Sequence, residues 1–223
     1  NVDSAETAEG RVAAWKVNAT AVSYLAEVAR KNDITLVHIS TDYVFDGTQN
    51  SHTETEDFSP LSVYGDSKAA GDLLVGSTPK HYILRTSWVI GEGNNFVRTM
   101  LGLGKKGINP TVVADQIGRL TFTSELVRAI DHLLNTKAPY GTYNVSNDGE
   151  SKSWADITRE IYKQAGLTNT VTDTSTAEYY ADKDGIAPRP LQSTLDLTKI
   201  KSTGFDTTNW NIDLKKYIEK EDA

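Results

Sequence analysis

The sequence contains no cysteine and only one methionine among its 223 residues. The absence of thiols excludes disulfide bridges and thiolate metal sites. No apolar run approaches the roughly 20 residues that a membrane-spanning helix needs, and no secretion signal is visible. We therefore expect no membrane partner and a cytoplasmic location.

A basic excess is also missing, because the formal net charge is −7. This charge argues against nucleic acid as a main partner. It leaves room for a phosphorylated ligand, since a pocket can be locally basic. The histidines His38, His52, His81 and His132 are scattered and none pairs with another at i, i+4, so we predict no metal site.

The glycine-rich turn that opens a dinucleotide-binding domain is missing from its usual place. Such a domain begins with a strand, that turn and a helix, whereas residues 1–10 are polar and residues 11–30 have helical apolar spacing. One G-x-G-x-x-G string, Gly102 to Gly107, follows a helical stretch rather than a strand. We interpret it as the C-terminus of that helix, where glycine and lysine are common.

The stretch from residue 34 to residue 75 carries the strongest pattern that is present. Residues 34–39 form a short β-branched run that predicts a buried strand. The polar residues 40–42 follow it, at the carboxyl end of the strand, where open α/β sheets bind ligands. A helix is predicted over residues 62–75, and Tyr64 and Lys68 share one of its faces.

These side chains can support proton transfer to a carbonyl oxygen. A phenol has a pKa of about 10, and the ammonium of Lys68 would lower the pKa of Tyr64. Thr41 could hold the substrate oxygen while a nicotinamide delivers hydride, or accepts it in the opposite direction. Tyr179 and Lys183 have the same spacing, but no strand precedes them, and we interpret that pair as part of a solvated loop.

Several longer strings resemble one enzyme family. VHISTDYVFDG, YGDSKAAGD, LRTSWVIGEGNNFVRTML and DQIGRLT are similar to the extended short-chain dehydrogenase/reductases, and within them to the dTDP-4-dehydrorhamnose reductases. The resemblance extends from VDSAE near the start to APRPLQSTLD near the end. It implies that the Gly-rich turn and the first strands of the family lie upstream of Asn1, as a missing or fused N-terminal segment.

The resemblance also implies the roles of individual residues. Tyr64 would be the proton donor and Lys68 its pKa partner and ribose ligand, with Thr41 completing the catalytic set. The implied substrate-binding residues are Thr41, Asp42 and Trp88, and the implied cofactor-binding residues are Tyr64, Lys68 and Ser87.

The reaction implied is reduction of the 4-keto group of dTDP-4-dehydro-L-rhamnose to dTDP-L-rhamnose, in the biosynthesis of cell-surface polysaccharide. NADPH would be the cofactor, with NADH as an alternative, and the enzyme could be a homodimer. Two other functions stay open. One is a non-catalytic regulatory subunit that binds a dinucleotide. The other is a related sugar-nucleotide epimerase or dehydratase, because Asp42 supplies an acidic residue beside Thr41.

The fold class expected is α/β, a Rossmann-like doubly wound parallel sheet that lacks its N-terminal βαβ half and carries a smaller C-terminal α/β lobe. We assign residues 1–147 to the cofactor-binding domain and residues 148–223 to the substrate lobe, with an approximate, interwoven boundary. Further strands are expected at 81–88, 111–114 and 141–146, helices at 96–103, 124–134, 153–165 and 212–220, and a loop over 168–190.

Some side chains admit two interpretations. Trp15 and Tyr24 are expected in the core, and Trp88 either in the core or stacked on a ligand ring. Gln116 and Arg119 could face a ligand or solvent. Thr123 or Ser124 is expected to cap one helix, and Ser153 another. Arg189 is expected to contact a phosphate or sugar, or to form a surface ion pair.

Overall fold

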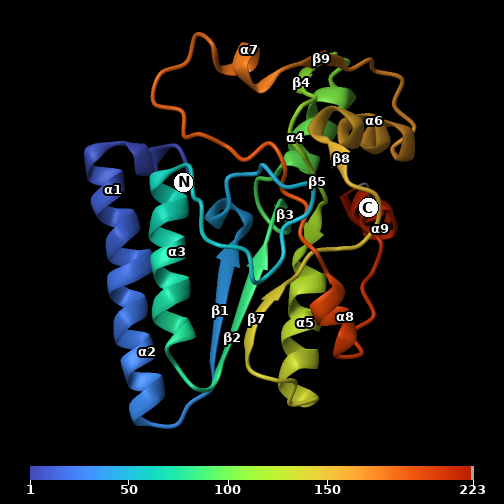
Figure 1. The fold of residues 1–223 in the computed structure, drawn as a ribbon. Helices are drawn as coiled ribbons and strands as arrows, with labels where there is room; N and C mark the ends of the chain where they lie inside the picture. The colour runs from blue at the N-terminus through green and yellow to red at the C-terminus, as the bar shows by residue number, and fades with distance from the viewer. Residues whose placement is uncertain (222–223) are drawn as a thin grey trace.

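A three-stranded parallel sheet lies at the centre of this computed structural model, which describes residues 1–221 (Figure 1). Its order is β1-β2-β7, and the register sets Thr41 opposite Thr86. The carboxyl ends of β1 and β2 are therefore level, and the polar residues that follow them meet at one edge of the sheet. The strands are β1 (Leu36–Thr41), β2 (His81–Thr86) and β7 (Gly141–Asn144).

Helices cover both faces of this sheet (Figure 1). The helical layer of α1, α2 and α3 lies on one side, and α5 and α8 lie on the other. This arrangement and the parallel strands confirm the α/β, doubly wound fold class. The bounds are α1 (Ala8–Trp15), α2 (Ala21–Lys31), α3 (Val63–Gly76), α5 (Thr123–Asn135) and α8 (Thr198–Ser202).

The alternation of side chains along β2 explains the two layers. Ile83 packs with Val75 of α3 on one face of the sheet, whereas Leu84 packs with Leu133 of α5 on the other. Both β2 residues are almost fully buried, as expected for a strand that is covered on both faces. The prediction of a buried strand is wrong for the first part of β1, where Ile39 is 41% exposed, because among residues 1–221 β1 pairs with β2 alone.

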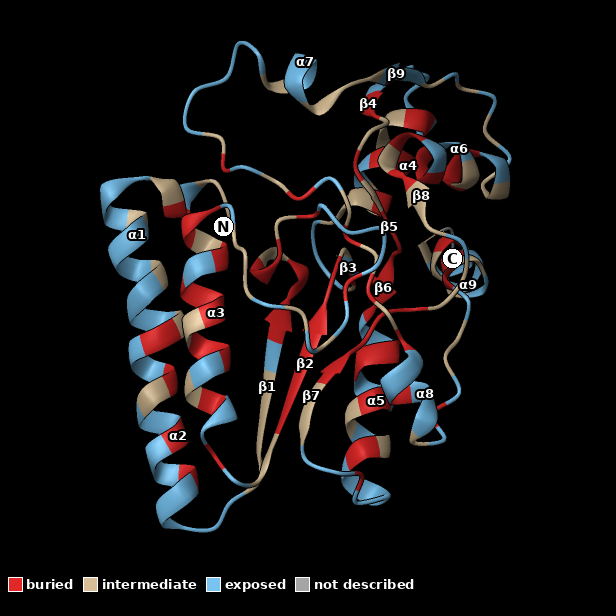
Figure 2. Ribbon diagram, viewed as in Figure 1, coloured by how far each residue is buried: buried red, intermediate tan, exposed pale blue. Residues whose placement is uncertain are grey.

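The helix predicted over residues 11–30 is present but starts earlier. The Thr7 side chain accepts a hydrogen bond from the Gly10 amide and begins α1, and a π-helical segment, η2 (Lys16–Thr20), joins α1 to α2. The core assignments of Trp15 and Tyr24 are wrong, since they are 42% and 64% exposed. The run buries only a narrow strip of small side chains, and most of its outer surface is exposed (Figure 2).

A second lobe lies beyond the carboxyl end of the sheet (Figure 1). Its core is formed by apolar residues of α4, α6 and α9, among them Leu101 and Ile161. Parts of the chain before and after residue 147 interleave in it, because β4 pairs with β9 and β5 with β8. Its helices are α4 (Phe96–Lys105), α6 (Trp154–Gln164), α7 (Thr176–Tyr180) and α9 (Trp210–Glu221), and its strands are β3 (Val89–Ile90), β4 (Thr111–Val113), β5 (Ile117–Gly118), β6 (Thr121–Phe122), β8 (Lys152–Ser153) and β9 (Thr172–Thr174).

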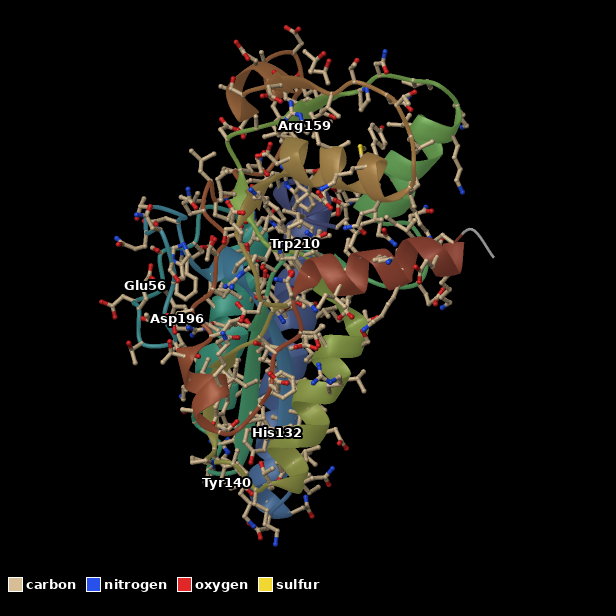
Figure 3. All side chains as sticks on the ribbon, turned by 90° about the vertical axis from the view of Figure 1, so that its right-hand side faces the viewer. Glu56, His132, Tyr140, Arg159, Asp196 and Trp210 are labelled. Carbon is tan, nitrogen blue, oxygen red and sulfur yellow. The ribbon has the colours of Figure 1, made fainter. Side chains whose placement is uncertain are left out.

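Figure 3 shows the same arrangement from the side. Arg159 lies on the second lobe, whereas His132 and Tyr140 lie at the opposite end of the molecule. Trp210, at the start of α9, lies between them. Within residues 1–221, none of the helices has the length and apolar character needed to cross a membrane.

Local predictions about this lobe were partly correct. The string from Gly102 to Gly107 does end a helix, and Ser153 does cap α6. The loop expected over residues 168–190 instead contains β9 and α7. Pairing with β4 holds β9, and a capping box between Ser175 and Glu178 starts α7. The cap predicted for α5 is wrong, because Phe122 occupies the N-cap position and no side chain caps it.

Candidate active site

The end of β1 and the first turn of α3 bring the predicted catalytic residues together. Thr41 ends β1 and begins a short 3₁₀ turn, η3 (Asp42–Val44). Its hydroxyl accepts a hydrogen bond from the Tyr43 amide at 3.2 Å and donates one to the Asp42 carboxylate at 3.1 Å. The phenol of Tyr64 lies near the same hydroxyl, which lowers the pKa of that phenol. Thr41, Asp42 and Tyr64 thus lie in one cluster.

A glycine allows α3 to approach this cluster. Ser62 caps the helix by accepting a hydrogen bond from the Gly65 amide at 3.2 Å. A Cβ atom on Gly65 would lie 2.3 Å from the carbonyl oxygen of Tyr43, well inside van der Waals contact. Only glycine therefore fits here without displacing η3 or α3, and the close approach fixes Tyr64 beside Thr41.

The pKa of Tyr64 is raised in this structure. Burial is the main cause, the nearby Thr41 hydroxyl opposes it, and the carboxylates of Asp42 and Asp72 add to the rise. The direction differs from the expectation that Lys68 lowers this pKa. The Lys68 ammonium donates to the carbonyl oxygen of Ile39 at 2.6 Å, and burial lowers its own pKa. A phenol with a raised pKa keeps its proton at neutral pH. The same rise makes it a weaker acid, so release of the proton needs positive charge near the ring.

Asp42 is a buried carboxyl whose charge is sensitive to pH. It is 2% exposed, and burial raises its pKa to about 6, whereas the nearby hydroxyls of Ser193 and Thr41 and the charge of His52 lower it. Its neighbour Ser193 comes from a distant part of the chain and has no motif of its own, so sequence reasoning missed it. The Asp42 carboxyl thus lies beside the Thr41 hydroxyl, with Ser193 near it.

Two adjacent residues follow β2 at the same edge of the sheet. The Ser87 side chain is buried, and its hydroxyl has no hydrogen-bond partner among residues 1–221. Trp88 has a positive φ of 46°, and its ring stacks on Trp154 with 3.7 Å between centroids and 16° between planes. A Cβ atom on Gly118 would lie 3.0 Å from the Trp88 ring. Trp154 and the Gly118 backbone therefore both pack against the Trp88 ring.

Beside this stack lies a cavity of about 260 Å³, and half of its lining residues are aromatic. The Tyr43 ring connects it to the catalytic cluster, because that ring meets Tyr64 edge-on with centroids 5.6 Å apart. Tyr43, Phe96 and Trp154 were not predicted, since they are far apart in sequence and carry no common pattern. Among the residues that line the cavity are Tyr43, Trp88, Phe96, Gln116, Trp154 and Arg189.

The polar candidates around the cavity have different surroundings. Gln116 lines it, donates to Thr176 at 3.0 Å and accepts from Trp154 at 3.3 Å. Arg189 also lines it and is bound by both carboxylate oxygens of Asp3, at 2.8 and 2.9 Å. Such a guanidinium can also bind a phosphate.

Arg119 faces neither solvent nor this cavity. It is 7% exposed, and its guanidinium donates to the Leu195 carbonyl and to Asp148. Its role is therefore to hold two segments together. The second Tyr-x-x-x-Lys pair is not a catalytic arrangement either, because the Lys183 ammonium lies over the ring of Tyr179, 3.7 Å from its centroid. Tyr179 belongs to α7 and lines the cavity, so the prediction of a loop was wrong for this residue, but it is 41% exposed, as expected for a solvated position.

Comparisons with known proteins identify close relatives. The family model described as RmlD substrate binding domain matches residues 1–223. A dTDP-4-dehydrorhamnose reductase of Aggregatibacter actinomycetemcomitans is 39% identical over 233 residues, which cover 96% of this chain and 76% of that protein.

Two solved structures named dTDP-4-dehydrorhamnose reductase have the same fold. The one from Bacillus anthracis, in complex with NADP, has a TM-score of 0.89 at 36% identity and covers 99% of this chain and 77% of its own. The one from Clostridium acetobutylicum has a TM-score of 0.90 at 37% identity and covers 100% of this chain and 78% of its own.

Proposed function

The chain belongs to the RmlD substrate-binding-domain family, and on this premise we propose that it catalyses NADPH-dependent reduction of dTDP-4-dehydro-L-rhamnose. The 4-keto group becomes the 4-hydroxyl of dTDP-L-rhamnose. The observation that carries the proposal is the cluster of Thr41, Tyr64 and Lys68 beside a cavity with aromatic walls. A regulatory subunit would not require this set, and the reductase names of the relatives favour reduction over epimerisation or dehydration.

The cavity suits a nucleotide sugar. The stacked rings of Trp88 and Trp154 offer a flat apolar wall for a base or sugar face, and Gln116 offers an amide to a base edge. Arg189 supplies a guanidinium that can bind the diphosphate bidentately. Asp42 would accept or donate a hydrogen bond at the sugar, according to its protonation.

The residues at the sheet edge fit the nicotinamide riboside end of NADPH. The buried Ser87 hydroxyl is unpartnered among residues 1–221 and available to a carboxamide or ribose oxygen. The Lys68 ammonium donates one of its three protons to Ile39 and lies within reach of His38 with a second, so one is available to a ribose hydroxyl. The NADP bound to the Bacillus anthracis relative supports the choice of this cofactor, with NADH as the alternative.

The bound cofactor supplies hydride to the substrate carbon. Tyr64 gives its phenolic proton to the carbonyl oxygen, which becomes a hydroxyl. Its raised pKa keeps the phenol protonated until negative charge develops on that oxygen. Thr41 turns its single hydroxyl proton from Asp42 to the same oxygen and holds it against the phenol. The ammonium of Lys68 offers positive charge as the phenolate forms.

We assign residues 1–147 to the cofactor side and residues 148–223 to the substrate side. The boundary is interwoven, because α4 and β4 pack with α6 and β9. The cytoplasmic location and a homodimer stay predictions.

The decisive test is the Tyr64→Phe variant of the natural protein, assayed by NADPH oxidation with dTDP-4-dehydro-L-rhamnose. Loss of the acid should lower kcat by roughly 10²- to 10⁴-fold. The NADPH dissociation constant, measured by nicotinamide fluorescence, should stay within a factor of two or so, because the ring remains.

The control is Tyr24→Phe, which removes the same hydroxyl from an exposed tyrosine and should leave kcat unchanged. If turnover were unchanged in Tyr64→Phe, Tyr64 would lose the proposed role. A wild-type protein that does not oxidise NADPH with this substrate would contradict the function itself.

A further inference from the structure

One helical turn after Lys68, α3 carries a buried carboxylate, Asp72, on the same face as Tyr64 and Lys68. Asp72 stands four residues after Lys68, which in turn stands four residues after Tyr64, so the three side chains share one helix face. Asp72 is 2% exposed. The mechanism above gives it no role, although it is the nearest buried anion along this face of α3.

The two carboxylate oxygens of Asp72 face different partners. Arg85 of β2 donates from Nε to Oδ2 at 3.0 Å. The other oxygen, Oδ1, lies 3.7 Å from Nε2 of His38, and that same nitrogen lies 3.4 Å from the Lys68 ammonium. One ring nitrogen of His38 therefore lies close to both the carboxylate and the ammonium.

Arg85 has enough contacts of its own to stay in place. Its guanidinium donates to the Glu54 carbonyl at 3.2 Å and lies over the rings of Phe45 and Phe58, 5.2 and 4.9 Å from their centroids. A rigid cation on β2 thus fixes the position of Asp72 from the side away from Lys68.

We propose that Asp72 is a positioning residue for the active site, the fixed counter-ion that keeps the buried Lys68 ammonium charged beneath Tyr64. The inference rests on the proposed function for its catalytic consequence, but its electrostatic content concerns residues of this chain alone. A buried ammonium without a counter-ion loses its proton readily.

The charges around the pair are consistent with this role. Burial lowers the pKa of Lys68, and the charge of Asp72 raises it in part. Burial lowers the pKa of His38 to about 4, with a further contribution from Lys68, so that the ring is neutral near pH 7 and can accept a hydrogen bond from the ammonium. The other charged or titratable groups near the pair are Arg85 of β2, Tyr64 of α3 and Asp42 of η3.

The test compares two variants that break the same ion pair from opposite sides. Asp72→Asn removes the anion, which should lower the pKa of Lys68 by about one unit or more. Arg85→Gln removes the cation and leaves Asp72 to act on Lys68 alone, so the pKa of Lys68 should rise. If the ion pair between Asp72 and Arg85 were purely structural, both variants should shift the pKa of Lys68 in the same direction.

The primary readout is the pH titration of Lys68 by NMR of protein labelled with [ε-¹³C]lysine, without cofactor or substrate. The Lys68 signal is assigned as the one missing from Lys68→Arg. The alkaline limb of kcat/KM should move in the same direction as this titration in each variant, because Asp72 also raises the pKa of Tyr64. Asp72→Glu, which retains the charge, should restore the wild-type limb.

Three outcomes are distinguishable. Opposite shifts in Asp72→Asn and Arg85→Gln support the inference. Shifts in the same direction, or an unmoved Lys68 titration in Asp72→Asn, overturn it while the wild-type reductase activity stands. If Asp72→Asn does not fold, a fall in the Lys68 pKa in Arg85→Gln still overturns it, and a rise supports it.

Discussion

The position of the catalytic tyrosine depends on the absence of a side chain at Gly65. In Gly65→Ala the new Cβ would start 2.3 Å from the Tyr43 carbonyl oxygen, whereas ordinary contacts begin at 3.4 Å. The first turn of α3 and η3 must therefore separate by about 1 Å, a displacement that can lower turnover roughly 10²-fold. Overpacking of this kind costs about 1–3 kcal/mol.

Two measurements separate these effects. Thermal unfolding should show a Tm lower by roughly 2–4 °C for each kcal/mol lost. Steady-state kinetics should show a lower kcat, because Tyr64 moves away from Thr41, whereas NADPH affinity should change less.

The matched control is Gly102→Ala, also in a helix but with no atom within 4 Å of the new Cβ. It should stabilise the protein by up to about 1 kcal/mol through helix propensity and leave kcat unchanged. If Gly65→Ala behaved like Gly102→Ala, the close approach of α3 and η3 would not position Tyr64.

Three further outcomes are expected. Trp88→Ala should raise the substrate KM roughly 2- to 10-fold by removing the stack on Trp154, and an effect confined to NADPH affinity would move Trp88 out of the substrate site. Asp42 has a folded pKa of about 6, above its usual 3.8, so it favours folding below pH 3.8 and loses that contribution as pH rises through 6. In urea unfolding, wild-type stability relative to Asp42→Asn should thus fall by up to about 3 kcal/mol between pH 4 and pH 7, and a constant difference would refute the raised pKa. Gly47 and Gly93 both have positive φ, but only at Gly47 would a Cβ meet backbone, that of residues 190 and 191; Gly47→Ala should therefore lower the Tm more than Gly93→Ala, and equal losses would show that backbone strain alone matters.

Periodicity predicted the long elements of this fold because they bury a continuous stripe. The helix over 62–75 and the strand over 81–88 were found close to their observed bounds, α3 and β2. Short polar elements were not found, because distant partners create them: β9 exists through pairing with β4, to which no local signal points. Trp15 shows the opposite error, an apolar residue assigned to the core that lies on an exposed helix surface.

Some residues of the candidate site could likewise be predicted from the sequence, and others could not. Thr41, Tyr64 and Lys68 could be predicted because strand and helix patterns place them at one sheet edge. Tyr43 and Trp154 could not, since only tertiary packing brings such distant aromatic residues to one cavity. The direction of the Tyr64 pKa was predicted wrongly, because sequence spacing reports the neighbouring charge but not the burial that outweighs it.

The ion pair between Arg189 and Asp3 couples ligand binding to the start of the chain. Arg189 can bind an anion in the cavity only by sharing or releasing Asp3, which also accepts a hydrogen bond from the Ala187 amide at 3.1 Å. By thermodynamic linkage, whatever affinity the diphosphate loses in this competition is matched by a loosening of the Asp3 contacts. Nucleotide binding should therefore accelerate amide hydrogen exchange at Ala187.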